Sequence, residues 1–477
     1  TGNPGPDRIA LVLEQPIQGL AMKVYSTLIL LLASLGLVAC DSENDPTSPA
    51  RPDPVSFADV QVLHGSADAP AVDVLVDGAV AVSALDYKAS SGWIELPEGT
   101  YSIEVQGILP DGNATVIGPV DLQFDGVTRY TVAAVNDVAT IEAVLLEQPR
   151  VAVSAGSARL FVLHGSAAAP TVDVYVTAPD ADLTAEAPVG TFSFKETIGP
   201  AEVPAGDYQI RVTAAGDPAA VVYDSGTITL NDADDFVVAA VPNTSGGTAA
   251  INLVALDRNG ATELFDVNTP AYLRVGHLSP DTPAVDVYAN AAPLLTDVAY
   301  PAITDILELP EPGTYAVEVA VAGQYPAGVA IGPADIELDA GTTTDVLAVN
   351  LLASIEALVL SDDRRQVATN AKVRIIHASP SAGNVDIYVT APAADITAET
   401  PLLTDVPFKA NTGYLSLAAG DYEVNVTPAG DNTTVAIGPV PLTVLDSGVY
   451  TAIARDPLPG ANEFALELLL DWPEAQP

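Results

Sequence analysis

Alternation of apolar and polar residues with a period of two is the dominant pattern along this chain. In the first copy of the pattern it covers residues 60–64 and 72–76; further β-rich runs lie at 101–105, 130–135 and 141–146, and Gly- and Pro-containing turns separate these segments. Val, Ile and Tyr at alternating positions favour half-buried strands, and turns at this spacing are typical of a β-sandwich. No segment after residue 57 has a convincing helical period.

The same pattern recurs four times, and each copy carries one of the four histidines of the chain. Each His is followed by Ser two residues later and by Val-Asp at eight and nine residues. The motif residues are His64, Ser66 and Asp73; His164, Ser166 and Asp173; His277, Ser279 and Asp286; and His377, Ser379 and Asp386. Units two and four share an insert, at 177–188 and 390–401, which units one and three lack. The short-long-short-long order indicates duplication of a two-domain unit.

We therefore predict an all-β protein of four tandem antiparallel β-sandwich domains. About 100 residues are enough for each domain to hold its own core. The expected boundaries are 58–149, 157–258, 271–361 and 371–472. Short linkers at 150–156, 259–270 and 362–370 suggest a row of separate domains that forms a semi-rigid rod.

A strand leading into His-x-Ser-Pro-Asp-x-Pro-x-Val-Asp-Val-Tyr and, later, Gly-x-Tyr-x-Val-x-Val resembles the bacterial "domain of unknown function 4397" family. Unit three matches best, at residues 277–288 and 313–319; unit four has Gly383 for the second Pro, and units one and two have Ala67 and Ala167 in place of the Pro that follows the Ser. The resemblance covers about residues 58–472. It implies immunoglobulin-like sandwiches in an exported protein, and it implies no known activity or ligand.

The amino-terminal region has the features of an export signal. The only Met, Met22, and Lys23 precede an apolar run at 28–39, which is too short to span a bilayer. The run ends Leu37-Val-Ala-Cys40, which resembles the lipobox of bacterial lipoproteins, in which the Cys is acylated. We expect 1–21 to be upstream mis-translation, 22–39 a signal peptide, and 40–57 the lipidated Cys40 with a disordered tether. The expected partner is a membrane, with the protein on the periplasmic face or the cell surface, and Asp41 leaves the choice of membrane open.

Composition excludes several classes of function. The 477 residues include 62 acidic and 17 basic ones, a net charge of −45, which is incompatible with binding nucleic acid through its phosphates. The single Cys excludes an internal disulfide and a cysteine zinc site, and one His per unit cannot hold zinc. Residues 231–235 and the pair Asp362-Asp363 are the acidic clusters that suggest calcium, but we interpret them as solvated turns or linker charges. No metal and no cofactor are expected.

The His, Ser and Asp of the motif raise the possibility of a hydrolase. A triad also needs an oxyanion hole and a nucleophile on a strained turn, and the chain has no Gly-x-Ser-x-Gly. Each His is in phase with inward-facing aliphatic residues at the end of a strand. Four near-identical copies favour a structural role for these residues, with the ring and the hydroxyl bonding their own turn. We therefore expect no enzyme activity.

Lysine is scarce, and three lysines recur at one position, eleven residues before the Gly of the Gly-x-Tyr turn: Lys88, Lys195 and Lys409. Such a lysine either forms a surface ion pair or cross-links to Asn or Asp in an isopeptide bond, and the ion pair is the more common of the two.

A sugar-binding platform would need exposed aromatic residues, for which Trp93, Trp472 and the motif tyrosines are the candidates. The leading functional hypothesis is a non-enzymatic surface spacer, adhesion or interaction module with an extracellular protein or glycan partner. The alternative is a polysaccharide or cell-wall binding module.

Overall fold

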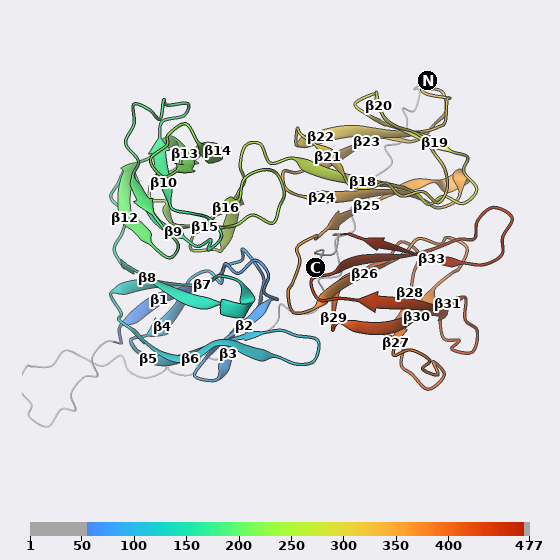
Figure 1. The fold of residues 1–477 in the computed structure, drawn as a ribbon, viewed down its shortest axis with the longest axis horizontal. Coiled ribbons are helices and arrows are strands. Elements are labelled where there is room, and N and C mark those ends of the chain that lie inside the picture. Colours follow the sequence, from blue (N-terminus) through green and yellow to red (C-terminus); the bar gives the residue numbers. More distant parts are fainter. Residues whose placement is uncertain (1–54, 472–477) are drawn as a thin grey trace, which may run out of the picture. The chain divides into compact units, whose positions relative to one another are not determined.

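The computed structural model describes residues 55–471, and within that range nearly all regular structure is β-strand (Figure 1). Short 3₁₀ turns occur at Val138–Thr140 and Leu352–Ser354. The strands form eight sheets, two for each histidine motif, so the prediction of tandem β-sandwiches is confirmed. The predicted signal peptide, Cys40 and the region before Val55 lie outside the described residues.

Sandwich 1 pairs two four-stranded sheets. One has the order β4–β1–β7–β8 and is called the His sheet here, because β1 ends at His64; the other has the order β3–β2–β5–β6. β1 and β7 are parallel, whereas all other neighbouring strands are antiparallel. The strands are β1 (Phe57–His64), β2 (Val72–Val76), β3 (Ala79–Leu85), β4 (Ile94–Pro97), β5 (Gly99–Gly107), β6 (Ala114–Phe124), β7 (Thr128–Val135) and β8 (Glu142–Pro149).

Sandwich 2 repeats this arrangement with one addition. Its His sheet has five strands, β12–β9–β15–β16–β17, and its second sheet has the order β11–β10–β13–β14. The strands are β9 (Ser157–His164), β10 (Val172–Thr177), β11 (Gly190–Phe192), β12 (Thr197–Pro204), β13 (Gly206–Ala214), β14 (Val221–Leu230), β15 (Asp235–Pro242), β16 (Ile251–Leu256) and β17 (Ala261–Leu264). The extra strand β17 pairs with β16, so sandwich 2 continues into the segment that was expected to be a linker.

Sandwiches 3 and 4 have the same plan as sandwich 1. Their His sheets are β21–β18–β24–β25 and β29–β26–β32–β33, and their second sheets are β20–β19–β22–β23 and β28–β27–β30–β31. Sandwich 3 consists of β18 (Ala271–His277), β19 (Val285–Ala289), β20 (Ala292–Val298), β21 (Leu307–Leu309), β22 (Gly313–Val321), β23 (Val329–Leu338), β24 (Thr343–Val349) and β25 (Glu356–Asp362). Sandwich 4 consists of β26 (Ala371–His377), β27 (Val385–Thr390), β28 (Leu403–Val406), β29 (Asn411–Leu417), β30 (Gly420–Pro428), β31 (Ile437–Val444), β32 (Val449–Arg455) and β33 (Ala465–Leu470).

Each sandwich has its own apolar core between its two sheets. In sandwich 1, Val60 and Val62 of β1 pack with Val72 and Val74 of β2, and the fully buried Phe124 closes the core. Alternate residues of a strand point to opposite faces, so period-two patterning places these aliphatic side chains together. Removing this surface from water is the main stabilising contribution to each sandwich.

The opposite faces of the His sheets are also buried, and they form two further cores that join the sandwiches in pairs. Residues of β1, β7 and β8 pack against residues of β9, β15 and β16 in the first shared core. Residues of β24, β26 and β32, with neighbours, form the second. The central parallel pair of each His sheet is therefore covered on both faces, as parallel strands usually are. The sequence-based expectation of separate domains in a row missed these contacts.

Within residues 55–471, no helix is long and apolar enough to cross a membrane.

Candidate functional site: the histidine motif and the paired His sheets

The motif histidine clamps the turn that follows its strand. Its Nε2 lies within hydrogen-bond distance of the carbonyl oxygen six residues later, at 2.9, 3.2, 3.0 and 2.8 Å in sandwiches 1 to 4. In sandwiches 1, 3 and 4 the Nδ1 accepts a longer hydrogen bond, of 3.3–3.4 Å, from the backbone N–H of the motif Ser. Because Nδ1 accepts, the ring proton belongs on Nε2, which donates to the carbonyl.

An aromatic ring meets the edge of each histidine ring. The pairs are His64 with Tyr87, His164 with Phe192, His277 with Tyr300, and His377 with Phe408, at centroid distances of 6.2, 6.0, 6.2 and 6.3 Å. The four imidazoles are 0–2 % exposed. Edge-to-face contact with an aromatic ring and a hydrogen-bonded turn hold the imidazole in one orientation.

Burial lowers the pKa of His64, His277 and His377, because removing the ring from water disfavours its charged form. These rings are therefore neutral at pH 7. In the three copies with a bonded Nδ1, both ring nitrogens are occupied by backbone groups, which leaves no lone pair for a substrate proton.

The motif serine does not direct its hydroxyl at the histidine. In sandwich 3 the Ser279 Oγ pairs with Thr282 Oγ1 at 2.5 Å, and in sandwich 4 the Ser379 Oγ donates to the Asp456 carboxylate. In both cases it is the serine N–H that faces the ring. The nucleophile-to-base hydrogen bond of a hydrolytic triad is not made there.

The motif aspartate holds the turns of the second sheet. Asp286 accepts from the backbone N–H of Asp297 at 2.9 Å through Oδ1 and from that of Gly323 at 2.8 Å through Oδ2. These two bonds lower the pKa of Asp286. Asp386 has the same two kinds of backbone partner, in Asp405 and Gly430. Because the aspartate alternates with core valines on its strand, it points away from the core that the histidine borders.

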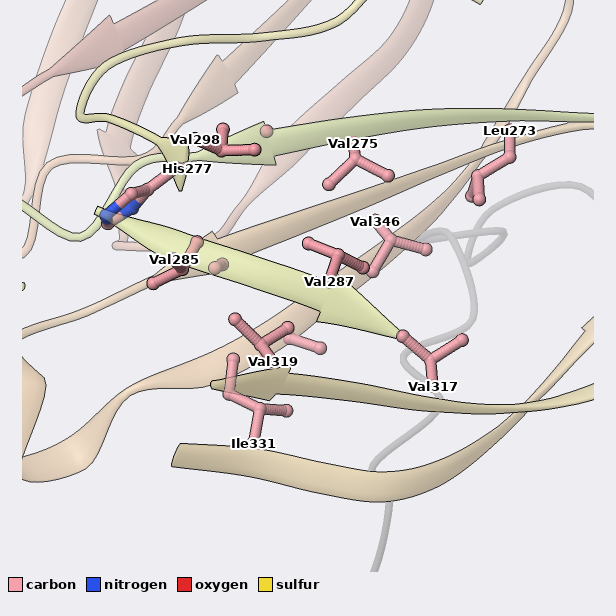
Figure 2. Close-up of a pocket in the computed structure, with 13 residues that line it drawn as sticks. Leu273, Val275, His277, Val285, Val287, Val298, Val317, Val319, Ile331 and Val346 are labelled. Atoms are coloured by element: carbon pink, nitrogen blue, oxygen red, sulfur yellow. The ribbon is translucent and has the colours of Figure 1, made fainter. Parts of the chain in front are cut away.

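The cavities beside the histidines are small and apolar. Figure 2 shows His277 at one end of the core of sandwich 3, beside Val285 and Val298, with Val275, Val287 and further aliphatic residues along the core. The space among these side chains is about 20 Å³, and the corresponding space beside His164 is about 30 Å³. Ligand pockets are usually ~300 Å³ or more, so these are packing voids rather than substrate sites.

The three recurring lysines lie at equivalent turns and reach across the paired His sheets. All three have positive φ, and the backbone N–H of each donates to the carbonyl of the motif histidine at 2.8 Å. Lys195 pairs with Glu142 of sandwich 1 at 3.1 Å, and Lys409 pairs with Glu356 of sandwich 3 at 3.0 Å. Lys88 lies 2.5 Å from Glu263 on β17 of sandwich 2 and has a side chain only 11 % exposed. Sequence reasoning found the lysines, but it could not find glutamates so far away along the chain.

The face between sandwiches 1 and 2 is mainly apolar. Its twelve buried residues are Leu63, Tyr87, Ala133, Val135, Leu146, Phe161, Leu163, Val237, Ala239, Val241, Val254 and Leu256. Polar contacts lie beside this core: the Tyr87 hydroxyl donates to the Pro242 carbonyl, and Arg129 bridges Asp59 and Asp235.

The face between sandwiches 3 and 4 has a smaller apolar core and a buried ionic cluster. The core consists of Leu278, Leu347, Val349, Ile376, Ala378 and Ile453. The cluster, called the ionic cluster below, consists of Arg274, Arg374, Asp345, Asp362 and Asp471, and each of these side chains is at most 5 % exposed.

Charges in the ionic cluster are paired across the two sandwiches. Arg374 of sandwich 4 donates to Asp345 of sandwich 3 at 2.6 Å, and Arg274 of sandwich 3 lies 2.6 Å from Asp471. Burial raises the pKa of Asp345 to about 6, because the neighbouring arginines only partly offset the loss of hydration and Asp362 repels its charge. Burial likewise raises the pKa of Asp471.

The acidic clusters considered for calcium have other partners. Asp362 belongs to the ionic cluster, and Asp363 pairs with Lys372 at 2.5 Å. The interpretation of Asp362 as a solvated linker charge is therefore wrong, because β25 carries it into the face between two sandwiches. In residues 231–235, Asp234 bonds the backbone and side chain of Asn231 within its own turn. The described residues contain no group of three or more His, Cys, Asp or Glu side chains arranged to hold a metal ion.

The aromatic candidates for sugar binding are mostly covered. Tyr175 and Tyr388 are 3 % and 2 % exposed, and both belong to the sandwiches that carry the insert. In sandwich 3, which lacks the insert, Tyr288 stacks on Tyr325 with centroids 3.9 Å apart, and both residues are partly exposed. Arg129 lies over the Trp93 ring, and Trp472 is outside the described residues.

Comparisons with known proteins identify one family. No curated protein matches the chain. Among solved structures, the chain is similar to one described as "The Bacillus anthracis TIE protein", with 12 % identity and a TM-score of 0.14, over 84 % of this chain and 68 % of that one. The family described as "Domain of unknown function (DUF4397)" matches residues 58–175, 271–388 and 389–477. The first two segments run from the first strand of a short sandwich through the Asp-Val-Tyr or Asp-Ile-Tyr motif of the next. The matched segments cover more than half of the sequence, and the chain therefore belongs to the DUF4397 family.

Proposed function

We propose that this protein is a lipid-anchored, extracytoplasmic, non-enzymatic module that acts as a surface spacer or in adhesion and interaction. The observation that carries the proposal is the use of the motif's polar groups. Each histidine bonds the turn of its own sandwich, and the motif aspartates bond turns of the second sheet. A residue set that stabilises its own domain in four copies supports a scaffold rather than four reaction centres.

The decisive experiment separates a structural from a catalytic motif. His277→Ala should lower the midpoint of thermal unfolding, since it removes a buried ring and leaves the Pro283 carbonyl without its donor. A hydrolase screen of the full chain should give the same background for the wild type and for Ser279→Ala. Unchanged stability of His277→Ala together with an activity that both variants abolish would refute the proposal.

Anchoring is supported by Leu37-Val-Ala-Cys40, which follows an apolar run. Cells fed an alkyne-tagged fatty acid should label the wild-type chain, and Cys40→Ser should remove the label and release the protein from the membrane fraction. Labelling that survives Cys40→Ser would place the lipid elsewhere or overturn the anchor.

A glycan-binding role is the second candidate, and the partly exposed Tyr288–Tyr325 stack favours it. A glycan array of the wild-type chain, with Tyr325→Ala as the matched variant, tests it. A signal that the variant loses would support glycan binding, and a blank array would leave the spacer or protein-interaction role.

A further inference from the structure

Lys88, Glu263 and Asn252 form a compact group at the face between sandwiches 1 and 2. Lys88 Nζ lies 2.5 Å from Glu263 Oε1, and Asn252 Nδ2 lies 2.5 Å from the same oxygen. The two nitrogens are therefore no more than about 5 Å apart. Lys88 belongs to sandwich 1, whereas Asn252 and Glu263 lie on β16 and β17 of sandwich 2.

The group is held rigidly and largely away from water. Asn252 is fully buried, and the Lys88 and Glu263 side chains are 11 % and 21 % exposed. The Lys88 backbone N–H is fixed by the His64 carbonyl, and the neighbouring Tyr87 hydroxyl bonds Pro242 across the face. Reacting groups held in this way have a high effective concentration.

We propose that Lys88 and Asn252 join in an isopeptide bond, with the Glu263 carboxylate as the catalytic residue. The bond would link sandwich 1 covalently to sandwich 2.

The reaction balances without an oxidant or a cofactor. Glu263 takes a proton from the Lys88 ammonium, and the neutral Nζ attacks Asn252 Cγ to form the new C–N bond. The Cγ–Nδ2 bond then breaks. Nζ loses two protons and keeps one, and both lost protons reach the leaving nitrogen, the first by way of Glu263. The products are a secondary amide and ammonium, so the total charge is unchanged.

Two further features of the site suit this chemistry. Burial lowers the pKa of Lys88, which makes its neutral, nucleophilic form easier to reach. The Asn252 Oδ1 is buried and has no hydrogen-bond partner, and protonated Glu263 would supply a donor for it during the attack. Lys88 and Ser245 also line a polar cavity of about 210 Å³ that can receive the ammonium.

The other two lysines are internal controls. Lys195 and Glu142 are 44 % and 41 % exposed, and Lys409 and Glu356 are 34 % and 39 % exposed. Asn350 contacts Glu356 at 3.1 Å, so Lys409 also has an amide near its glutamate, but in a hydrated setting. Both lysines are more exposed to water than Lys88, so we expect ordinary surface ion pairs at both positions.

The test is peptide mass spectrometry of the purified full-length protein after trypsin digestion. We expect a branched peptide joining residues 88 and 252, lighter than its two parts by one ammonia, and no cleavage after Lys88. Lys88→Arg, Asn252→Ala and Glu263→Gln should each abolish the branch completely, while Lys195→Arg should retain it.

Separate, unmodified peptides from the folded wild-type protein would overturn the proposal, and this result does not depend on whether any variant folds. A branch to Glu263 with loss of water would also overturn it, because Glu263 would then be the acceptor. A branch that persists in Glu263→Gln would refute the role of the carboxylate. None of these outcomes depends on the proposed spacer or adhesion role.

Discussion

The two faces that join the sandwiches have the same geometry but different chemistry. Between sandwiches 1 and 2 the His sheets pack through a large aliphatic and aromatic core, with ion pairs beside it. Between sandwiches 3 and 4 the apolar core is half as large in residue number, and the ionic cluster is buried next to it. An apolar face tolerates rearrangement of its side chains, whereas buried charges stabilise the contact between two sandwiches only when every charged partner is in place. The two pairs of sandwiches are thus held together by different kinds of contact.

The largest effect is expected from removing one charge of the ionic cluster. Arg374→Met leaves Asp345 and Asp362 buried with one arginine instead of two, and should lower the free energy of unfolding by about 4 kcal/mol. This loss is measured by urea unfolding of the full chain, with far-UV circular dichroism as the signal for the backbone structure. The double variant Arg374→Met/Asp345→Leu should lose less than the sum of the single changes. Strict additivity would show that these two charges do not interact.

Truncating an aliphatic side chain at the other face should have the next largest effect. Leu163 is 1 % exposed within the shared core of sandwiches 1 and 2, and Leu163→Ala should cost about 3 kcal/mol through lost burial and a cavity. Differential scanning calorimetry of the full chain should show a lower transition temperature. Val151→Ala, at a residue 56 % exposed, is the control and should change little. Equal effects of the two changes would mean that the face opens in solution.

A smaller effect concerns the pH dependence of stability and comes from the ionic cluster. The pKa of Asp345 is raised to about 6 in the folded protein, above its ordinary value, so the folded state binds this proton more tightly than the unfolded state. The stability of the wild type relative to Asp345→Asn should therefore fall as pH rises from about 4 to about 6, and stay level above that. The lowered pKa values of His277 and His377 act in the opposite direction, because their contribution is lost as pH falls below about 6.5. The histidine contributions cancel in the comparison, because the wild type and the Asp345→Asn variant carry the same histidines. A stability difference between the two proteins that stays constant across this pH range would rule out titration of Asp345.

The smallest effect is expected at the exposed ion pair. Lys195→Ala removes the contact with Glu142 and should change stability by less than about 1 kcal/mol, with a further decrease of the effect in high salt. Chemical denaturation at low and high salt measures it. A loss of several kcal/mol would show that the pair is more buried in solution than its 44 % and 41 % exposures indicate.

The fold was largely predictable from the sequence because period-two alternation fixes which residues of a strand share a face. Val60 and Val62 were placed correctly in the core of sandwich 1. The faces between sandwiches were not predicted, since the opposite side of the same strand also carries buried residues, such as Leu63. The unbroken apolar run of residues 132–135 was the available signal, because a strand covered on both sides has no polar face to alternate with.

The candidate sites were predicted only in part. The spacing of the repeats identified the histidines and the three lysines, because both recur in register. The partners of the lysines could not be predicted, because Lys88 and Glu263 are 175 residues apart in the sequence. In addition, the strand that carries Glu263, β17, is an extra strand that the other described His sheets lack. The ionic cluster was missed for a similar reason: Asp362 is the final residue of β25 and Asp471 directly follows β33, and charge at the end of a unit usually indicates solvent.

The parallel pairing of β1 with β7 determines how a sandwich responds to a pulling force. Because β7 is parallel to β1 and antiparallel to β8, the start of β1 at Phe57 and the end of β8 at Pro149 lie at the same end of the His sheet. Arg150 even donates to the Phe57 carbonyl there. In a chain without the Lys88–Asn252 bond, tension applied through the chain therefore pulls β1 and β8, which flank β7, from one end, and it loads their hydrogen bonds one after another instead of together. We expect such a sheet to open by peeling at low force, so a chain pulled from its ends without that bond would lengthen gradually under load rather than resist until it fails.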